Sequence, residues 1–579
     1  MCIRDSDIPI NDAGTGEAEL GRINLDHLDA IVVEVDGIGG VVHLSSHDPS
    51  TLMTDGIRVE LNGGRGGFHL ARSGFKLEGA RRGLSGLLSL GRTTERGDFP
   101  YRLDSGARGR RINNHAAKWA ATGRLHATYS GWTIDGGAYW EVSSRGVPGL
   151  LHNAPTPQAQ LEDRRISGSV SASSRIRCIA FRANAFVSDY TARYTSPAEQ
   201  FNPTTGRIIR HFPPEDNRQT GLRWGLKADA TVPGRTISLH AEYAFQADEY
   251  LGEDLLRDEI TVGGVGLGAA HRSAHRLELG ATIRKSRFGI NWHLKPTFTT
   301  RLVVDDGAGR YFAGSPGLAF GCDKRLPAAT IGLNAAFSRS IRVPPFNALF
   351  LQENMFALGN RNLKPERGEY KSAGVNLTSI SGTDIEWRVA ATLFRRVTRD
   401  LIIWRRNSFG KYFPDNVARV KAFGIELNGH LQPKSGVFSL AGSYVHNDAR
   451  NDTPGDINRG KVPPLIARHS GSASLTLHRY GFGITFNGRW VGRRYSTESN
   501  LDPISTAGMG LAPFEVYDLV ISRSFSLGGS NATIRIAVEN LLDENYRVVE
   551  RSPMPGRAVF GELEINFHDS FGKGRRPPR

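Results

Sequence analysis

The side chains most capable of chemistry in this 579-residue chain include two histidines, His271 and His275, in the spacing HxxxH. On a helix this spacing places two imidazoles on one face, but the zinc-peptidase motif has Glu directly after the first histidine, and Arg272 stands there. On a strand, four residues span about 13 Å, which is too far for one metal ion. We therefore predict neither a metal site nor a catalytic pair at these histidines.

The other chemical patterns are weaker. The run GGVGLG at 263–268 lacks the full GxGxxG spacing and is followed by neither Gly-Lys nor a helical pattern, so we interpret it as a flexible loop. Cys2, Cys178 and Cys322 are far apart and form no CxxC, which argues against a zinc site or a disulfide framework. No GxSxG is present. The sequence thus predicts no catalytic residue, no metal ligand and no cofactor.

Charge patterning also limits the partners. The chain has 73 Lys+Arg against 58 Asp+Glu, a formal charge of +15. The basic residues are spread along the chain and alternate with apolar residues instead of forming one block, so nucleic acid is not a predicted partner. No uninterrupted apolar run approaches the roughly 18 residues of a spanning helix. Any membrane crossing must therefore use strands.

Period-two alternation, typical of strands with one apolar face, dominates after residue 50. In GFGITFNGRW the residues Phe482, Ile484, Phe486 and Trp490 share one face, opposite Thr485, Asn487 and Arg489. In ATIRIAV and AVFGELEINF the polar face carries Arg535, Glu562 and Glu564. Such charged faces need water, which either a soluble sandwich or a water-filled barrel provides.

The connections favour the barrel. Short turns are predicted at 381–384, 433–436, 479–481 and 527–530. They alternate with long polar loops, predicted at about 342–368, 405–418, 449–467, 496–513 and 541–557. Outer-membrane barrels have short turns at one rim and long loops at the other, whereas a sandwich has no reason for this asymmetry.

Counting strands gives the size of the barrel. The pattern places ten strands between residues 326 and 567 and 11 or 12 more between 51 and 325. We therefore predict an all-β fold, a large antiparallel transmembrane β-barrel of about 22 strands, the size associated with plugged outer-membrane transporters.

Several segments resemble the TonB-dependent receptor family. The segment 338–377 is similar to the family's Arg-x-Pro…Gly-Asn-x-x-Leu-x-Pro-Glu loop, and 399–429 is similar to its two strands leading to Gly-x-Glu. The C-terminal segment 538–567 resembles the family's last loop and terminal strand, which ends in an aromatic residue. The matching residues are Arg342, Pro344, Gly359, Asn360, Leu363, Pro365, Glu366, Gly424, Glu426, Asn540, Leu541, Asp543, Tyr546, Pro555, Gly556, Arg557 and Phe567.

The N-terminal segment LDAIVVEVDGIGGVVHLSS resembles the end of the family's plug domain, with a turn at Gly39 and Gly40. We expect 7–50 to be the C-terminal remnant of a plug, 51–567 the barrel and 568–579 a basic tail. On this reading the rest of the plug, the TonB-contact box and the secretion signal are absent from this chain, as in a truncated gene product.

The resemblance implies a monomeric transporter in the bacterial outer membrane that imports a scarce, large solute. Its implied partners are outer-membrane lipid, the inner-membrane TonB energy-coupling complex, the barrel-insertion machinery and a small-molecule chelate as cargo. A ferric siderophore is the first expectation, with cobalamin or another nutrient as the alternative. A passive plugless porin, if the chain is complete, and an outer-membrane hydrolase are the remaining alternatives.

Aromatic residues in the long loops are the candidate ligand contacts. They are Phe346, Phe350, Phe356, Tyr412, Phe413, Tyr495 and Tyr546. The same residues are also compatible with an interfacial belt or with loop packing. Lumen-facing Arg489 and Arg535 suit an anionic ligand, but lumen hydration or pairing with Glu539 and Glu562 is the favoured interpretation.

Overall fold

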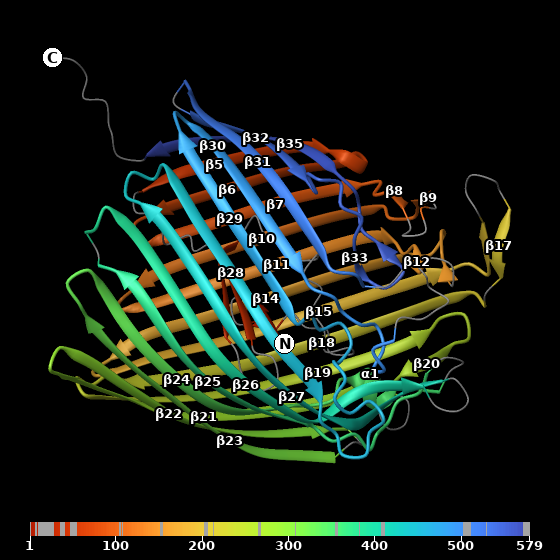
Figure 1. Ribbon diagram of the computed structural model, residues 1–579, viewed down its shortest axis with the longest axis horizontal. Helices are drawn as coiled ribbons and strands as arrows, with labels where there is room; N and C mark the ends of the chain where they lie inside the picture. Colours follow the sequence, from red (N-terminus) through yellow and green to blue (C-terminus); the bar gives the residue numbers. More distant parts are fainter. Residues whose placement is uncertain are drawn as a thin grey trace.

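Twenty-two long antiparallel strands close into a barrel in the computed structural model of the chain (Figure 1). The structure describes residues 55–570 except 103–105, 107, 151–153, 202–206, 212, 264–267, 307–308, 354–356, 381, 407–410, 502–510 and 529. Before residue 55 it describes the backbone of 2–5, 8–9, 28–34 and 41–46.

The barrel strands follow one another in chain order. They are β5 (Gly56–Gly66), β6 (Leu70–Arg81), β7 (Leu84–Glu95), β10 (Ala116–Tyr129), β11 (Trp132–Gly146), β14 (Gln160–Ile176), β15 (Ile179–Ser196), β18 (Glu215–Val232), β19 (Ile237–Asp254), β21 (Ala270–Arg287), β22 (Ile290–Asp305), β23 (Gly309–Arg325), β24 (Ala329–Arg342), β25 (Glu366–Ser379), β26 (Ile385–Arg406), β27 (Tyr412–Pro433), β28 (Phe438–Asn451), β29 (His469–Arg479), β30 (Phe482–Val491), β31 (Phe514–Leu527), β32 (Ser530–Glu539) and β35 (Ala558–Ser570). The meander closes where β35 pairs antiparallel with β5, which places Phe567 opposite Val59.

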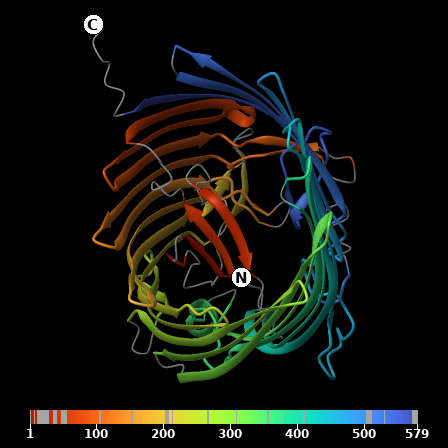
Figure 2. The ribbon, with the colours of Figure 1, turned by 90° about the vertical axis from the view of Figure 1, so that its left-hand side faces the viewer.

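The remaining elements are short. The loops hold η4 (Gly67–His69), β8 (Phe99–Arg102), β9 (Arg108–Arg111), β12 (Gly149–Leu150), β13 (Ala154–Pro155), β16 (Glu199–Phe201), β17 (Ile208–His211), β20 (Glu259–Val262), α1 (Phe346–Phe350), β33 (Arg547–Val549) and β34 (Ser552–Pro553). A separate four-stranded sheet in the order β2-β1-β4-β3 comprises β1 (Cys2–Asp5), β2 (Ile8–Pro9), β3 (Leu28–Glu34) and β4 (Val41–Ser46). Figure 2 shows these red strands within the ring of the barrel.

The two rims differ as the sequence predicts. Ten connections of two to five residues lie at one rim, and the predicted turns at 381–384, 433–436, 479–481 and 527–530 fall among them. The long loops and their small elements gather at the other rim, on the right of Figure 1. The tightest turns use left-handed backbone, as at Ser130 (φ 49°) and Gly131 (φ 81°), because such turns match the twist of a hairpin.

One predicted long loop is wrong. The segment 405–418 is mostly strand, because β26 runs to Arg406 and β27 begins at Tyr412. Ile402 and Trp404 pair with Asn416 and Pro414, beyond an irregularity in the ladder between Thr398 and Leu401. The hairpin therefore extends past the neighbouring strands.

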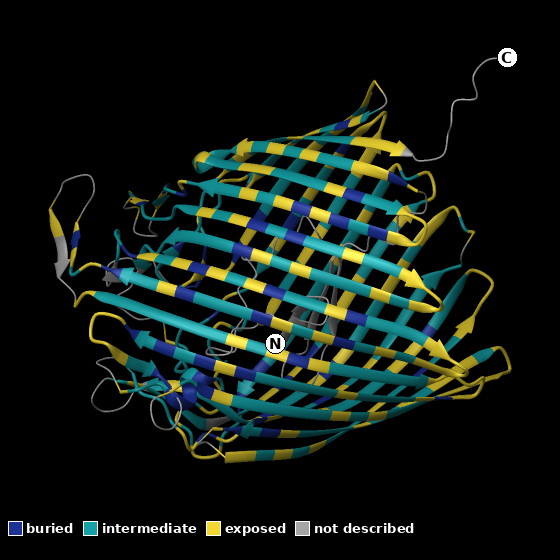
Figure 3. Cartoon of the chain, turned by 180° about the vertical axis from the view of Figure 1, so that it is seen from behind, coloured by how far each residue is buried: buried dark blue, intermediate teal, exposed yellow. Residues whose placement is uncertain are grey.

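The barrel wall has its apolar face outside and its polar face inside. Leu333, Leu393 and Phe423 are 50%, 50% and 57% exposed on the outer face, whereas the acidic side chain of Glu141 is buried and lies 2.9 Å from the Lys118 ammonium. Exposed and covered residues therefore alternate along the strands (Figure 3). This arrangement suits a wall between lipid and a water-containing lumen. Within the described residues, no helix has the length and apolar character needed to cross a bilayer.

Candidate functional site: loops and lumen of the barrel

The connection between β24 and β25 folds into the mouth of the barrel around a buried aromatic cluster. Phe346 and Phe350 on α1 are 0% and 1% exposed, and their ring centroids are 6.0 Å apart. The ring of Tyr250, from the end of β19, stacks on Phe346 at 6.0 Å. The described members of the cluster are Tyr250, Val262, Ala270, Phe346, Ala348, Leu349, Phe350 and Leu363. As folded, Phe346 and Phe350 present no surface to a ligand, which favours their interpretation as loop packing.

Arg272 on β21 ties this cluster to the barrel wall. Its guanidinium donates to the Pro344 carbonyl at 2.8 Å and to Asp305 Oδ2 at 3.1 Å. The same group lies 4.6 Å from the centroid of the Phe346 ring. One cation thus holds the loop through a carbonyl and an aromatic face while Asp305 on β22 neutralises it.

Gly359 and Asn360 close the loop back on α1. The Gly359 amide donates to the Leu351 carbonyl at 2.9 Å, and the Asn360 amide donates to the Ala348 carbonyl at 2.7 Å. A Cβ on Gly359 would lie 2.8 Å from Leu351 N, so this close approach requires glycine. The Asn360 side chain also donates to the Pro414 carbonyl at 3.1 Å, which joins the loop to β27.

The loop leaves toward β25 through Leu363, Pro365 and Glu366. Leu363 is buried, and Pro365 is half-buried before the strand begins. Glu366 is fully buried, accepts from the Ile402 amide at 2.9 Å, and lies 2.5 Å from Arg342 Nε. The structure therefore brings the predicted Arg342 and Glu366 into one ion pair across β24 and β25.

Sequence reasoning did not single out Asn416, which also fixes this exit. Its side-chain oxygen accepts from the Lys364 amide at 2.7 Å, and its nitrogen donates to the Lys364 carbonyl at 2.9 Å and the Asp400 carbonyl at 2.7 Å. An isolated Asn in a predicted loop gives no signal of such a role, because the contact joins segments about 50 residues apart.

Gly424 marks a second close approach, on β27. A Cβ there would lie 2.1 Å from the His446 carbonyl oxygen and 2.5 Å from the Phe394 ring. Glu426, two residues on, is partly exposed. The Gly-x-Glu pair thus lies on a barrel strand, away from the loops.

The C-terminal loop is organised by Asn540, which is 4% exposed and left-handed at φ 48°. Its side-chain nitrogen donates to the carbonyls of Glu544 and Pro555 at 2.9 and 3.2 Å, and its oxygen accepts from the Glu544 amide at 2.8 Å. The Leu541 amide donates to the Tyr517 carbonyl at 2.7 Å. Asp543 Oδ1 accepts from the Arg557 amide at 2.8 Å, and a Cβ on Gly556 would lie 2.5 Å from that oxygen.

The other candidate aromatics are more accessible. Tyr412 is 42% exposed, and Phe413 and Tyr495 are partly exposed. Tyr546 packs against Phe514 at 4.7 Å between ring centroids, and burial raises the pKa of its phenol. Phe356, Gly39 and Gly40 lie outside the described residues. Tyr412 and Phe413 therefore lie on β27, whereas Tyr495 and Tyr546 lie on separate loops.

A recess in the lumen wall spans β25 to β31 and has a volume of about 680 Å³. Its lining carries the cationic side chains of Arg388 and Arg489, His430, and amide and hydroxyl groups, with Asp518 as the carboxylate. Asp518 accepts from the Asn540 amide at 2.8 Å. Of these residues, the sequence analysis named Arg489 alone. The same alternation places Arg388 on the lumen face, because its neighbours Trp387 and Val389 face outward.

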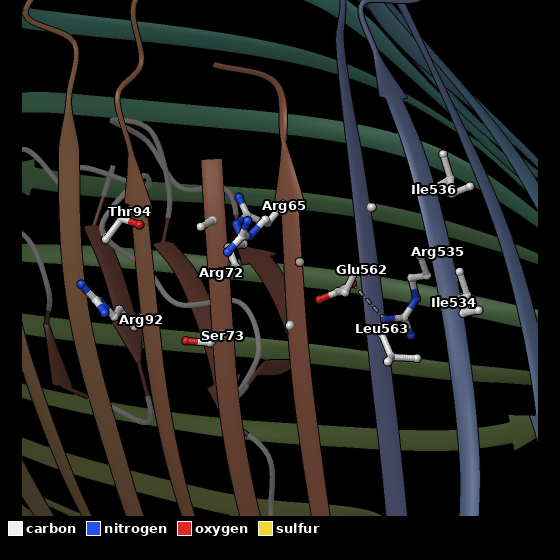
Figure 4. Close-up of a pocket in the computed structure, with 14 residues that line it drawn as sticks. Arg65, Arg72, Ser73, Arg92, Thr94, Ile534, Arg535, Ile536, Glu562 and Leu563 are labelled. Atoms are coloured by element: carbon white, nitrogen blue, oxygen red, sulfur yellow. Dashed lines mark hydrogen bonds and ion pairs between the residues drawn. The ribbon is translucent and has the colours of Figure 1, made fainter. Parts of the chain in front are cut away.

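Arg535 lies in a different stretch of wall, where Figure 4 shows it next to Glu562, with Arg65 and Arg72 on the strands beyond. Its guanidinium lies 3.2 Å from Glu562 and 2.7 Å from Glu564. His271 and His275 both lie on β21, where His275 contacts the Tyr243 hydroxyl at 2.8 Å. No group of three His, Cys, Asp or Glu suited to a metal ion occurs among the residues that the structure describes.

Comparison with known proteins identifies this architecture. Residues 78–541 match the family model described as "TonB dependent receptor-like, beta-barrel". The chain belongs to the TonB-dependent receptor family. Its fold is shared with solved structures of low sequence identity.

Three solved structures illustrate the likeness. The FrpB iron transporter from Neisseria meningitidis (F3-3 variant) is 13% identical with a TM-score of 0.74, and the match covers 98% of this chain and 91% of that chain. The copper transporter OprC is 14% identical with a TM-score of 0.74, covering 98% and 90%. The siderophore receptor PirA from Acinetobacter baumannii is 14% identical with a TM-score of 0.69, covering 98% and 90%.

Membership of the TonB-dependent receptor family shows where in the cell these loops and the lumen recess lie. The chain is an outer-membrane receptor and transporter, not an enzyme, and its transport is coupled to TonB. In such barrels the long loops are extracellular and the short turns periplasmic. The Arg342–Glu366 loop and the Asn540 loop of this TonB-dependent receptor therefore lie at the extracellular mouth, above the lumen recess.

Proposed function

We propose that this TonB-dependent receptor imports an anionic ferric chelate of the siderophore class and works as a monomer. The observation that carries the proposal is the lumen recess that holds Arg388, His430 and Arg489. Its cations attract an anionic ligand, while its amides and hydroxyls provide hydrogen bonds to a polar chelate. An iron transporter and a siderophore receptor share the fold, which supports this cargo class.

A binding experiment on the purified chain tests the cargo. Ferric citrate, a ferric catecholate, a ferric hydroxamate, cobalamin and free Cu²⁺ are titrated in parallel. We expect one anionic ferric chelate to bind tightest and the double variant R388A/R489A to weaken it at least tenfold. The variant R523Q removes an outer-face cation and should bind like the parent protein. Preferential binding of cobalamin or Cu²⁺ would contradict the proposed cargo.

We propose further that residues 7–50 are the end of a plug domain. The location of β3 and β4 within the barrel ring supports this assignment (Figure 2). Deleting 7–50 should therefore raise the ion conductance of the protein in planar bilayers. Equal conductance with and without this segment would instead favour the open-porin alternative.

A further inference from the structure

The outer wall of the barrel changes from apolar to basic near the extracellular rim over β24 to β28. Residues directly opposite one another on antiparallel strands share a face, so register defines rows across the wall. One row reads Phe337, Lys371, Arg395, Phe423 and Asp448. The row above it, nearer the loops, reads Arg339, Glu369, Val397, Lys421 and Arg450.

The face that carries these rows is the lipid-facing one. Phe423 is 57% exposed, and Leu393, one row toward the periplasmic rim, is 50% exposed. The row that contains Leu393 also contains Ala335, Ala373 and Ile425, and it ends on β28 at His446. Over β24 to β27 the two charged rows therefore lie immediately above an apolar band, as expected of residues near the headgroups of the outer leaflet.

Cations outnumber carboxylates in this patch, which we define as the two rows. Arg339, Lys371, Arg395, Lys421 and Arg450 face Glu369 and Asp448, a difference of 5 − 2 = +3. The nearby loop residue Asp452 lies 2.6 Å from both Lys421 and Arg419. Asp452 is thus shared between two cations, and the patch as a whole keeps an excess of positive charge.

The two carboxylates of the patch, Glu369 and Asp448, each lie close to two cations. Glu369 lies 3.3 Å from Arg339 and 3.1 Å from Lys371. Asp448 lies 2.9 Å from Arg450 and 3.0 Å from Arg468. Arg395 forms no ion pair or hydrogen bond within the part of the chain that the structure describes, and its side chain is exposed.

The patch is hollowed where the charges meet. A recess of about 340 Å³ is lined by four cations, Arg395, Lys421, Arg450 and the loop residue Arg459, by the two carboxylates of Asp448 and Asp452, and by Phe423 at its apolar side. Phosphate groups accept several charge-assisted hydrogen bonds from guanidinium and ammonium groups. A phosphate on an amphiphile seated here can keep its acyl chains against the apolar band below.

We propose that this basic patch binds a phosphate of the phosphorylated glycolipid, of the lipid A type, that faces it in the outer leaflet. The apolar band directly below the cations favours a membrane amphiphile over a free anion. This lipid site is separate from the lumen and goes beyond transport of the cargo.

Native mass spectrometry of the full chain with diphosphorylated lipid A tests the proposal. The triple variant R395Q/K421Q/R450Q should lower lipid A binding at least tenfold. The single variant R395Q should lower it less, and it disturbs none of the described ion pairs. Asp448→Asn should strengthen binding, because it frees Arg450 and Arg468 from a competing carboxylate.

Control experiments distinguish binding of the lipid from binding of a free anion, and a loss of binding from a loss of folding. R523Q removes a cation that lies over Phe482 near the periplasmic rim and should leave binding unchanged. Each variant must shift on unheated gels like the parent barrel. Dephosphorylated lipid A should not bind, and millimolar inorganic phosphate should not displace lipid A. Equal binding by the triple variant, equal binding of dephosphorylated lipid, or displacement by phosphate alone would overturn the proposal.

Discussion

Replacing Phe346 by alanine tests whether the extracellular loop is held by its own aromatic core. The side chain is fully buried, stacks on Tyr250 and lies under the Arg272 guanidinium. Truncating a buried Phe to Ala costs about 3–5 kcal/mol through lost burial and the cavity left behind. Because the cluster joins the loop to the wall, this cost should appear as easier local opening of 343–365.

Hydrogen exchange measured by mass spectrometry reports that opening. A loss of about 3 kcal/mol corresponds to a fall in protection of about 100-fold or more for loop peptides. Phe346→Leu keeps most of the volume and should cost less than about 1.5 kcal/mol. Tyr412→Ala removes a side chain that is 42% exposed and should change protection by less than about 1 kcal/mol. Unchanged protection in Phe346→Ala, or an equal loss in Tyr412→Ala, would refute the packing interpretation.

Three further predictions follow from particular contacts. Asn540→Ala removes three partly buried hydrogen bonds and should lower the free energy of urea unfolding of the reconstituted barrel by about 2–4 kcal/mol. Asn540→Asp keeps the acceptor and should lower it less, so equal losses would contradict this prediction. Gly424→Ala places a Cβ 2.1 Å from the His446 carbonyl and should cost about 1–3 kcal/mol, whereas Gly429→Ala meets nothing within 4 Å and should behave like the parent on unheated gels. The pKa of Asp452 is lowered chiefly by its hydrogen bond to Lys421. The stabilisation that this carboxylate gives the loop is therefore present above about pH 4, the pKa in the unfolded chain, and is lost as the pH falls through the lower pKa of the folded state. Proteolysis of the loop 452–468 should rise in that acidic window, and Asp452→Asn should abolish the pH dependence.

The barrel itself was predictable because each strand carries its own signal. Alternation at Phe482, Ile484 and Phe486 identifies an outward face that is about 40% exposed, and turns such as Tyr480–Gly481 fix where each hairpin ends. The ten strands predicted between 326 and 567 all exist. The last of them continues to Ser570, three residues beyond the predicted end at Phe567.

The loops were harder to predict, because their contacts join distant segments. Phe346 looks like an exposed loop aromatic in the sequence, yet Tyr250 and Val262, more than 80 residues earlier, bury it. The sequence predicts too short a hairpin for β26 and β27 because the polar segment 405–418 resembles a loop, whereas the ladder continues to the pair Arg406 and Tyr412. The family motif was more informative for the loops, because Arg342 and Glu366, which it singled out, form an ion pair.

Uptake of radioactive iron by intact cells tests the central claim most directly. A strain that lacks this gene is compared with the same strain complemented by the parent gene or by R388A/R489A, in backgrounds with and without TonB. Our account predicts that one ferric chelate accumulates only with the parent gene and TonB, and much less with the double variant. Accumulation of every ferric chelate that is independent of the gene or of TonB would contradict it.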